Sequence, residues 1–180
     1  VSAPKKFEEA QVKKVLSISV GSSSRDHTAR HTFLGQECEI SRQGTDGDFE
    51  KAIQRYADLD GKVDAFGVGG TDLGFLVGGR WYKLHSAQPL LRYIKETPVV
   101  DGTGLKLTLE KKAASLYQDH FAPAEADKKV LIMTAIDRWG LVEGFNDLNY
   151  QCVYGDLLFS LGIPIPLTNI KTVKRLLRLL

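Results

Sequence analysis

Residues 62–74 read K-V-D-A-F-G-V-G-G-T-D-L-G, and this stretch decides which class of fold the sequence predicts. A short apolar run, from Val63 to Val68, stops abruptly at Gly69 and Gly70. Such a run, ending in glycines, is typical of a buried parallel strand that breaks into a loop at its carboxyl end. Glycines there let a ligand approach the backbone, although a tight strand-to-loop turn alone produces the same pattern.

On both sides of this stretch, strand patterns alternate with helix patterns. Strands are predicted at residues 14–20, 39–42, 62–68, 97–100, 129–135 and 152–154, and helices at residues 49–59, 86–95, 105–121, 140–148, 157–161 and 169–180. Residues 75–84 form two apolar arms around Gly78 and Gly79, which predicts an inserted β-hairpin. The alternation predicts an α/β fold with a mainly parallel sheet flanked by helices, Rossmann-like and three-layered.

The longest predicted helix, residues 105–121, has its apolar residues on or near one stripe: Leu105, Leu109, Ala113, Leu116 and Phe121. Residues 123–127, P-A-E-A-D, are the best linker candidate after it. We therefore predict an N-terminal α/β substrate domain over 1–122, and the start of a second Rossmann-like βαβ unit, complete or incomplete, over 128–180.

The composition is that of an ordinary globular protein: 180 residues, 43% hydrophobic, 26% charged, with a net charge of +2. This balance gives no reason to expect nucleic acid as a partner, while a homo-oligomer stays open. Cys38 and Cys152 have no metal-site spacing and indicate reduced thiols in the cytoplasm, although two cysteines also allow one disulfide. No apolar run reaches the ~20 residues of a membrane span.

The last predicted helix, residues 169–180, separates basic from apolar residues. Lys171, Lys174, Arg175 and Arg178 recur at helical spacing between leucines and other apolar residues. A basic amphipathic helix can lie on an anionic membrane or bind a partner. It can equally be a domain helix that docks its apolar face.

Three strand-end loops carry an acid beside glycines. They contain Gly70, Thr71 and Asp72 in the first, Asp101, Thr103 and Lys106 in the second, and Asp137 and Gly140 in the third. Carboxylates and a lysine in one crevice suit proton transfer to and from a hydroxyl group. Lys106, Asp101 and Asp72 are therefore the candidate catalytic residues, although Asp-Gly is also common turn chemistry.

A polar loop after the first strand, Ser22-Ser23-Ser24-Arg25, has the hydroxyl, amide and guanidinium donors that hold an anion. His27 and His31 would share one face of a helix, as metal ligands do. No third ligand occurs at motif spacing, so we predict no metal and expect the histidines to form hydrogen bonds beside the loop.

Residues 134–140, T-A-I-D-R-W-G, stand where a dinucleotide fold carries G-x-G-x-x-G, but the first two glycines are missing. In this turn Arg138 would meet a phosphate, whereas Asp137 would oppose one. The candidate cofactor-binding residues are Thr134, Asp137, Arg138 and Gly140.

Several motifs together resemble a bacterial, cyanobacterial-type family called quinate 5-dehydrogenase. They are V-L-S-I-S-V-G-S-S-S-R-D-H, G-T-D-G-D, V-D-A-F-G-V-G-G-T-D-L, V-V-D-G-T-G-L-K, A-I-D-R-W-G and Y-G-D-L-L-F-S-L-G-I-P-I-P. The resemblance implies oxidation of a hydroxyl of quinate or shikimate with NAD or NADP. It implies Lys106 as acid/base and Asp101 or Asp72 as its partner. The substrate-binding residues that go with it are Ser22, Ser23, Arg25, His27, Gly70, Thr71 and Thr103.

Two functions from different classes follow from the sequence. The first is a quinate- or shikimate-type oxidoreductase. The second is an α/β module that binds a small anion or sugar phosphate without dehydrogenase activity, which the missing nucleotide glycines favour. A scaffold docked on a membrane or partner through residues 169–180 is a third interpretation.

Overall fold

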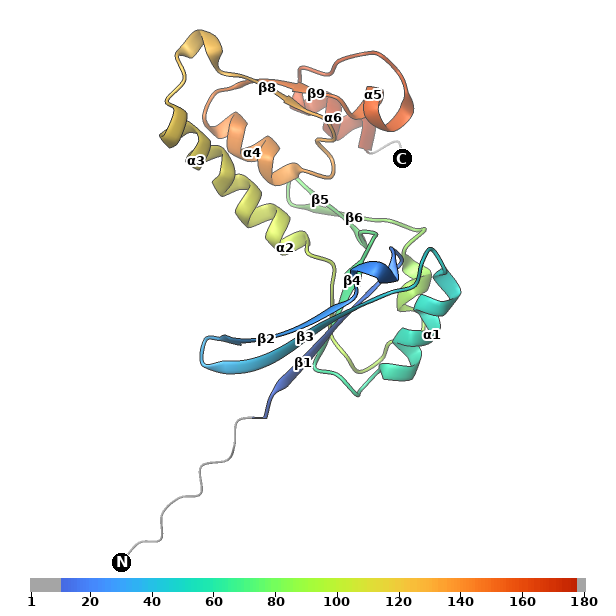
Figure 1. Cartoon of the computed structure of the whole chain (residues 1–180). Helices are drawn as coiled ribbons and strands as arrows, with labels where there is room; N and C mark the ends of the chain where they lie inside the picture. The colour runs from blue at the N-terminus through green and yellow to red at the C-terminus, as the bar shows by residue number, and fades with distance from the viewer. Residues whose placement is uncertain (1–10, 178–180) are drawn as a thin grey trace, which may run out of the picture. The chain divides into compact units, whose positions relative to one another are not determined.

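The computed structural model describes residues 11–177, which fold into two compact units (Figure 1). Unit 1 comprises Val1–Leu73 and Leu84–Asp101, and unit 2 comprises Gly74–Lys83 and Gly102–Leu180. The contacts thus divide the chain after Asp101. The predicted linker, 123–127, contains the short helix η4 (Glu125–Asp127) inside unit 2.

Unit 1 is built on one mixed sheet of five strands in the order β2-β3-β1-β4-β7. Its elements are β1 (Lys13–Ser19), η1 (Ser23–Arg25), β2 (His27–Phe33), β3 (Gln36–Gly44), α1 (Phe49–Leu59), β4 (Ala65–Gly69), η2 (Gln88–Leu91) and β7 (Val99–Val100). β1 lies parallel to both β3 and β4, and β4 lies parallel to β7, whereas β2 is antiparallel to β3.

The core of unit 1 lies between the sheet and α1, whose predicted bounds are confirmed. The Asp48 carboxylate caps the helix by accepting the Lys51 N–H at 2.9 Å. Tyr56, 1% exposed, packs on Phe66 and donates to the carbonyl oxygens of Ile18 and Gly67 at 2.9 and 3.1 Å. The helix is thereby fixed to the two central strands at once.

The strand β2 was missed by the sequence patterns. Its residues are all exposed, so the chain shows no apolar alternation there. Leu34 and Gly35 form the hairpin turn with φ values of 50° and 81°. Two-residue hairpin turns usually have the sequence Asn-Gly, because these residues accept positive φ values and leucine is disfavoured there. The sequence Leu-Gly therefore lacks the usual signal of a hairpin turn.

The predicted fold class, a mainly parallel, three-layer, Rossmann-like sheet flanked by helices, is wrong. The largest sheet is mixed, and the later strands β8 and β9 form a separate sheet instead of extending it. In the described part of unit 1, α1 and η2 pack into a single apolar cluster with residues such as Leu16 and Phe66, which lie on one face of the sheet. Both of these helical segments therefore lie on one face, whereas the prediction placed helices on both faces of a parallel sheet.

Unit 2 combines a hairpin, a two-stranded parallel sheet and several helices. Its elements are β5 (Gly74–Val77), β6 (Arg80–Lys83), α2 (Thr103–Leu105), the π-helical turn η3 (Lys106–Glu110), α3 (Lys111–Phe121), η4, β8 (Lys129–Ile132), α4 (Trp139–Asp147), β9 (Gln151–Tyr154), α5 (Asp156–Leu161) and α6 (Ile170–Leu177). The hairpin predicted around Gly78 and Gly79 is present as β5 and β6. Val77, Trp139, Tyr154 and Val173 are among the buried residues of the core.

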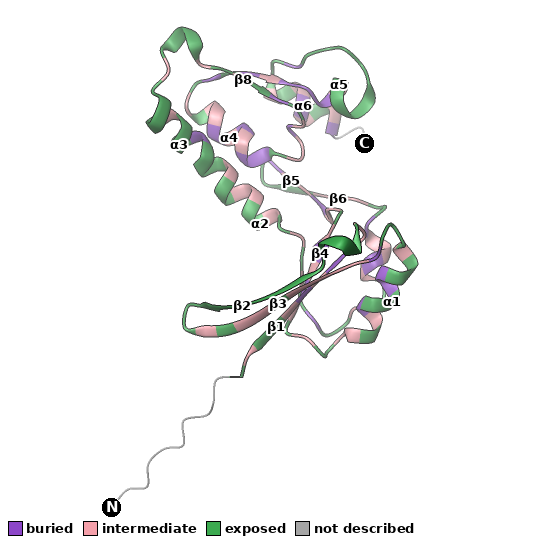
Figure 2. Ribbon diagram, in the orientation of Figure 1, coloured by how far each residue is buried: buried purple, intermediate pink, exposed green. Residues whose placement is uncertain are grey.

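The long helix predicted at 105–121 is divided among α2, η3 and α3, and its apolar stripe is exposed (Figure 2). Leu105, Leu109, Leu116 and Phe121 are 56 to 63% exposed, whereas the buried contact is made by Ala114. The face that packs is the one that meets the glycines of α4, which admit a close approach of Ala114.

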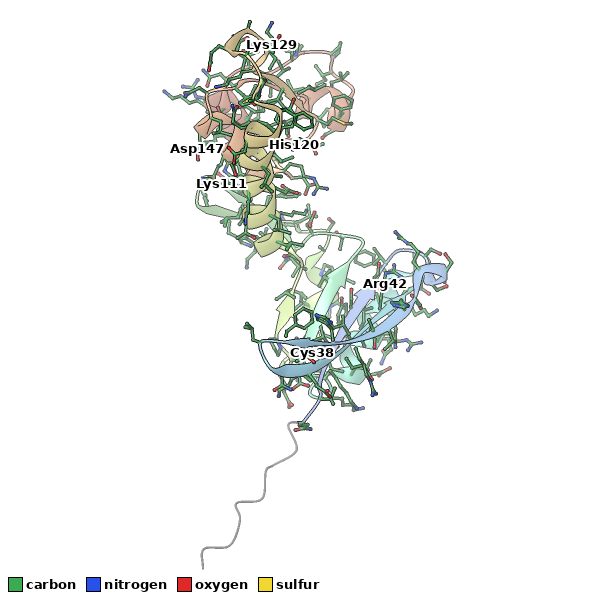
Figure 3. The ribbon with its side chains drawn as sticks, turned by 60° about the vertical axis from the view of Figure 1, so that its left-hand side comes forward. Cys38, Arg42, Lys111, His120, Lys129 and Asp147 are labelled. Carbon is green, nitrogen blue, oxygen red and sulfur yellow. The ribbon has the colours of Figure 1, made fainter. Side chains whose placement is uncertain are left out.

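α4 packs closely against η3 and α3 because two glycines stand at the contact. A Cβ on Gly140 would collide with the carbonyl oxygen of Lys106, and one on Gly144 would lie 2.7 Å from the Ala114 Cβ. Lys111 on α3 reaches Asp147 on α4 with an Nζ–Oδ2 distance of 2.8 Å (Figure 3). Gly140, predicted to bind a cofactor, therefore has a packing role.

The Asp60 carboxylate, which follows α1, ties together two segments of unit 1. It accepts the N–H groups of Thr97, Lys95 and Glu96 at 2.8, 2.7 and 3.2 Å. The hydrogen bond from Thr97 leads the causes that lower the pKa of Asp60 to about 2. Because this pKa lies below the ordinary value of 3.8, the stabilisation is complete above that value and is lost as the pH falls through about 2.

We expect Asp60→Asn to be less stable than the wild type at neutral pH. The difference should shrink below pH 4 and be lost as the pH falls through about 2, where the wild-type carboxylate becomes protonated. Urea midpoints measured across this pH range test this, with Asp58→Asn, at an exposed helix position, as the control. A difference that stayed constant with pH would contradict the assignment.

None of the helices among residues 11–177 combines the length and hydropathy needed to cross a bilayer. α6 packs its apolar side chains into unit 2, where Val173 and Leu177 are buried. This packing occupies the face that a membrane-surface role of 169–180 requires. Arg178 and the two leucines after it lie outside the described residues.

Candidate functional site

The loops at the carboxyl ends of β1, β3 and β4 are tied together by backbone hydrogen bonds. The Val20 N–H donates to the Gly69 carbonyl at 3.1 Å, and the Thr45 N–H donates to the Ser19 carbonyl at 2.8 Å. A Cβ on Gly70, whose φ is +78°, would lie 3.1 Å from the Gly21 nitrogen. Gly70 and Gly21 are therefore neighbours, as expected for loops at the same edge of a sheet.

Two guanidinium groups converge on the side of Gly21 that has no side chain. A Cβ on Gly21 would lie 2.8 Å from Arg25 Nη2 and 3.3 Å from Arg42 Nη2. Arg42, on β3 (Figure 3), is held in place because its Nη1 donates to Asp26 Oδ1 and to the Ser22 carbonyl, both at 2.9 Å. Within residues 11–177, the Arg25 side chain makes no ion pair or hydrogen bond.

The three serines of the loop differ in what they offer a ligand. The Ser22 and Ser24 hydroxyl oxygens lie 2.9 Å apart at an exposed position. The Ser23 N–H donates to Asp46 Oδ1 at 2.7 Å, and this hydrogen bond is the main cause that lowers the pKa of Asp46. Ser23 therefore holds the loop to β3's following turn, while the hydroxyls of Ser22 and Ser24 face outward.

Two other predicted residues, Asp101 and Thr71, form hydrogen bonds with backbone within unit 1. Asp101 Oδ2 accepts the Leu73 N–H at 2.9 Å, and the Thr71 hydroxyl donates to the Asp72 carbonyl at 3.3 Å. Asp72 and Asp101 also have further interactions. These contacts give Asp101 a structural role in closing the loop after β4.

His27 and His31 lie on the exposed strand β2, not on a helix. His27 is the register partner of Arg42, so the two share one face of the sheet. In the described part of the chain, no three histidine, cysteine, aspartate or glutamate residues are grouped so that they would hold a metal. Cys38 and Cys152 are both free thiols.

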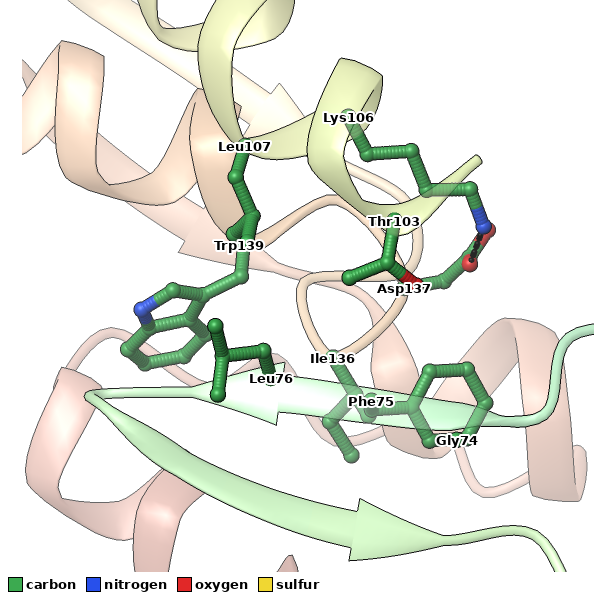
Figure 4. A pocket seen from close by; sticks show the side chains of 9 residues that line it. All are labelled: Gly74, Phe75, Leu76, Thr103, Lys106, Leu107, Ile136, Asp137 and Trp139. Carbon is green, nitrogen blue, oxygen red and sulfur yellow. Dashed lines mark hydrogen bonds and ion pairs between the residues drawn. The ribbon is translucent and has the colours of Figure 1, made fainter. Parts of the chain in front are cut away.

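Unit 2 has a small, open hollow with one ion pair at its edge (Figure 4). Lys106 Nζ lies 2.6 Å from Asp137 Oδ1, and the two side chains are 23% and 28% exposed. The walls are mostly apolar, with Thr103 as a hydroxyl: Gly74, Phe75, Leu76, Leu107, Ile136 and Trp139. Within unit 2, the structure thus gives Lys106 the carboxylate of Asp137 as a partner.

A second ion pair continues from the first. Arg138 Nη1 lies 2.7 Å from Glu110 Oε1, and its Nε lies 3.3 Å from Asp137 Oδ2. The other oxygen of Glu110, Oε2, is buried without a hydrogen-bond partner among the described residues. Arg138, predicted to meet a cofactor phosphate, instead links the two carboxylates of Asp137 and Glu110.

The turn at 134–140 does not fit the diphosphate of NAD or NADP. Its Ala135 and Ile136 N–H groups donate to the buried Asp156 carboxylate at 3.1 and 3.0 Å. The Thr134 carbonyl accepts the Arg138 N–H at 3.1 Å, and the Cα of Gly140 is covered by the Lys106 carbonyl. The N–H groups of Ala135, Ile136 and Arg138, which a phosphate would need at this turn, are therefore already used.

The structure brings Ser22, Ser23, Arg25 and Gly70 together around Gly21, and it joins Lys106, Thr103 and Asp137 at the hollow. Sequence reasoning missed three residues of these sites: Arg42, Glu110 and Asp156. Arg42 was assigned only to a strand, and the Y-G-D motif before α5 was the one signal for Asp156.

Comparison with known proteins gives families without an assigned activity. Residues 14–101 match a family described as a domain of unknown function (DUF8753), and residues 104–180 match a second, described as a domain of unknown function (DUF8754). No curated protein and no solved structure matches the chain. The chain is therefore similar to one family over most of unit 1 and to the other over most of unit 2, and the two matches meet where the units divide.

Proposed function

We propose that unit 1 binds a small oxyanion, a carboxylate or a phosphate group, over Gly21. The observation that supports this is the convergence of Arg25 Nη2 and Arg42 Nη2 on the space that a Cβ would occupy. Guanidinium groups present paired N–H donors that suit carboxylate and phosphate oxygens. The hydroxyls of Ser22 and Ser24 hydrogen-bond each other in the same loop, which leaves one of the two free to donate as well.

The charges of the site favour an anion of low charge. Asp26 neutralises Arg42 across 2.9 Å, so Arg25 contributes the uncompensated positive charge. The Asp46 carboxylate accepts the Ser23 N–H, so its negative charge is engaged by the backbone of the loop. One surplus guanidinium matches the single charge of a carboxylate, whereas a sugar phosphate, with a charge of about −1.5 to −2 at pH 7, is neutralised only in part.

We expect Gly21→Ala and Arg25→Ala to bind inorganic phosphate or acetate at least tenfold more weakly than the wild type. Alanine at 21 fills the space between the guanidiniums, and the atoms that it displaces are flexible side-chain ends, so the fold is kept. Isothermal titration calorimetry with each anion measures this. The control is Arg30→Ala, since Arg30 pairs with Glu39 on the same hairpin. Equal affinity in all four proteins would refute the proposal.

A quinate- or shikimate-type oxidoreductase is the second candidate, and the Lys106–Asp137 pair at the hollow is what favours it. A lysine beside a carboxylate can exchange a proton with a substrate hydroxyl, and Asp137 would hold the ammonium in place. NAD or NADP remains the proposed cofactor and would accept the hydride when bound. The turn at 134–140 is not the place that holds it, so no step is assigned through it.

For this candidate, we expect Lys106→Ala to lower turnover of quinate or shikimate by about 10²- to 10⁴-fold, the range for loss of a general acid/base. The control is Lys111→Ala, which removes an exposed lysine of the same helical segment. The measurement is nucleotide reduction followed by absorbance, with NAD and with NADP. No turnover by the wild type would refute this candidate and leave the oxyanion proposal standing.

The remaining assignments are proposals of the same kind. We propose a cytoplasmic protein that acts on a small molecule and not on nucleic acid, which the low net charge supports. A homo-oligomer stays compatible with the sequence.

A further inference from the structure

The turn between β8 and α4 occupies the position at which α/β nucleotide-binding folds hold a phosphate. In those folds the phosphate accepts backbone N–H groups between the strand and the following helix. Here the same two flanking elements are present, with β8 ending at Ile132 and α4 beginning at Trp139. The acceptor of the N–H groups between these two elements determines whether a phosphate can bind there.

In this protein the acceptor is the side chain of Asp156. Asp156 Oδ2 accepts the Ala135 N–H at 3.1 Å, and Asp156 Oδ1 accepts the Ile136 N–H at 3.0 Å. Both carboxylate oxygens are used by consecutive amides, as two oxygens of a bound phosphate would be. Asp156 is 7% exposed, so the carboxylate is enclosed and not merely resting on the surface.

Asp156 is positioned by the strand that precedes it. The Gly155 N–H donates to the Ile132 carbonyl at 2.9 Å, which extends the β8–β9 pairing by one step. A Cβ on Gly155 would lie 2.5 Å from Phe159 and 2.9 Å from the Met133 carbonyl oxygen. Glycine there lets the backbone pass close to β8 and brings Asp156 under the turn.

Other residues of unit 2 also surround the start of α4. The Lys106 carbonyl covers Gly140, and the Asp137 and Arg138 side chains pair with Lys106 and Glu110. The charges of Asp137 and Arg138 therefore meet opposite charges of the same unit, and Asp156 meets backbone N–H groups.

We infer that the turn after β8 is an anion-binding turn that the chain fills with its own carboxylate, Asp156, and that it is closed to the diphosphate of a dinucleotide. This inference is independent of the oxyanion site in unit 1. It also bears on the oxidoreductase candidate, because any NAD or NADP that binds this chain must contact other residues.

Replacement of the internal carboxylate by an added one tests the inference. All proteins in this test are the full chain with Arg25→Ala, a substitution that removes the anion site proposed for unit 1. In that background, Asp156→Gly should melt at a lower temperature in sodium chloride, and sodium acetate should raise its melting temperature. The parent and Asp156→Asn, which fills the space with an uncharged group of similar size, should not respond. If acetate raised the melting temperatures of all three proteins equally, or raised none of them, the inference would be overturned.

A second measurement uses the wild-type chain, so that it decides the matter even if Asp156→Gly does not fold. The amide resonances of Ala135 and Ile136 are followed by NMR while NAD or NADP is added. We expect both resonances to stay in place, whether or not nucleotide shifts resonances elsewhere. A nucleotide-dependent displacement of these two amides would show that the turn accepts phosphate and would overturn the inference.

Discussion

Gly140→Ala is expected to lower the free energy of unfolding by about 3 kcal/mol, at the upper end of the range for overpacked sites. The added methyl group would collide with the Lys106 carbonyl oxygen and lie 3.0 Å from the Glu110 Cβ. Backbone cannot rotate away as a side chain does, so α4 must move off η3. Movement of η3 also separates Lys106 from Asp137, and any activity that depends on this pair falls with the stability.

The matched control is Gly104→Ala in α2, two residues before η3. No atom lies within 4 Å of a Cβ at Gly104. Alanine is the better helix former by about 1 kcal/mol, so this variant should be as stable as the wild type or slightly more stable. Denaturant unfolding of both variants measures the difference. Equal destabilisation by the two substitutions would show that the close helix contact does not explain Gly140.

The second large effect is expected at Gly44, the last residue of β3. A Cβ there would lie 2.5 Å from the Ser22 carbonyl carbon and oxygen, and 2.6 Å from the Ser23 nitrogen. Gly44→Ala should therefore push the serine loop away from the sheet and cost about 1 to 3 kcal/mol. It should also abolish oxyanion binding, because the loop carries Arg25.

Gly21→Ala separates these two consequences. It obstructs the oxyanion site but meets only the far ends of Arg25 and Arg42 and the Ser19 hydroxyl. We expect normal stability with lost binding in Gly21→Ala, and loss of both in Gly44→Ala. Urea unfolding and calorimetric titration on the same samples distinguish the two patterns. Gly44→Ala with wild-type binding would place the anion elsewhere.

Local patterns predicted the elements that have an apolar face. The helix Phe49–Leu59 with its Asp48 cap, the strand around Phe66 and the hairpin around Gly78 were all confirmed. β2 could not be predicted, because neither face of this edge strand is buried and its turn lacks asparagine. Without β2, the sheet reads as parallel, and this led directly to the wrong fold class.

The site residues show the same division between local and long-range information. The loop Ser22 to Arg25 was identified from consecutive residues whose chemistry is visible in the sequence. Arg42 comes from a different strand, and only the pairing of β3 with β1 and β2 brings it to Gly21. The sequence indicates Lys106 through its nearness to Asp101 along the chain. The carboxylate that it contacts in unit 2, that of Asp137, is 31 residues away in the sequence.

The π-helical turn η3 makes the length of its segment as important as its composition. A π-helical turn holds one residue more than an α-helical turn. One deleted residue between Lys106 and Glu110 would therefore leave an ordinary α-helical turn, with Lys106 still facing Asp137 and Ala114 still facing Gly144. One inserted residue would instead rotate all that follows by about 100° and would break one of these two contacts.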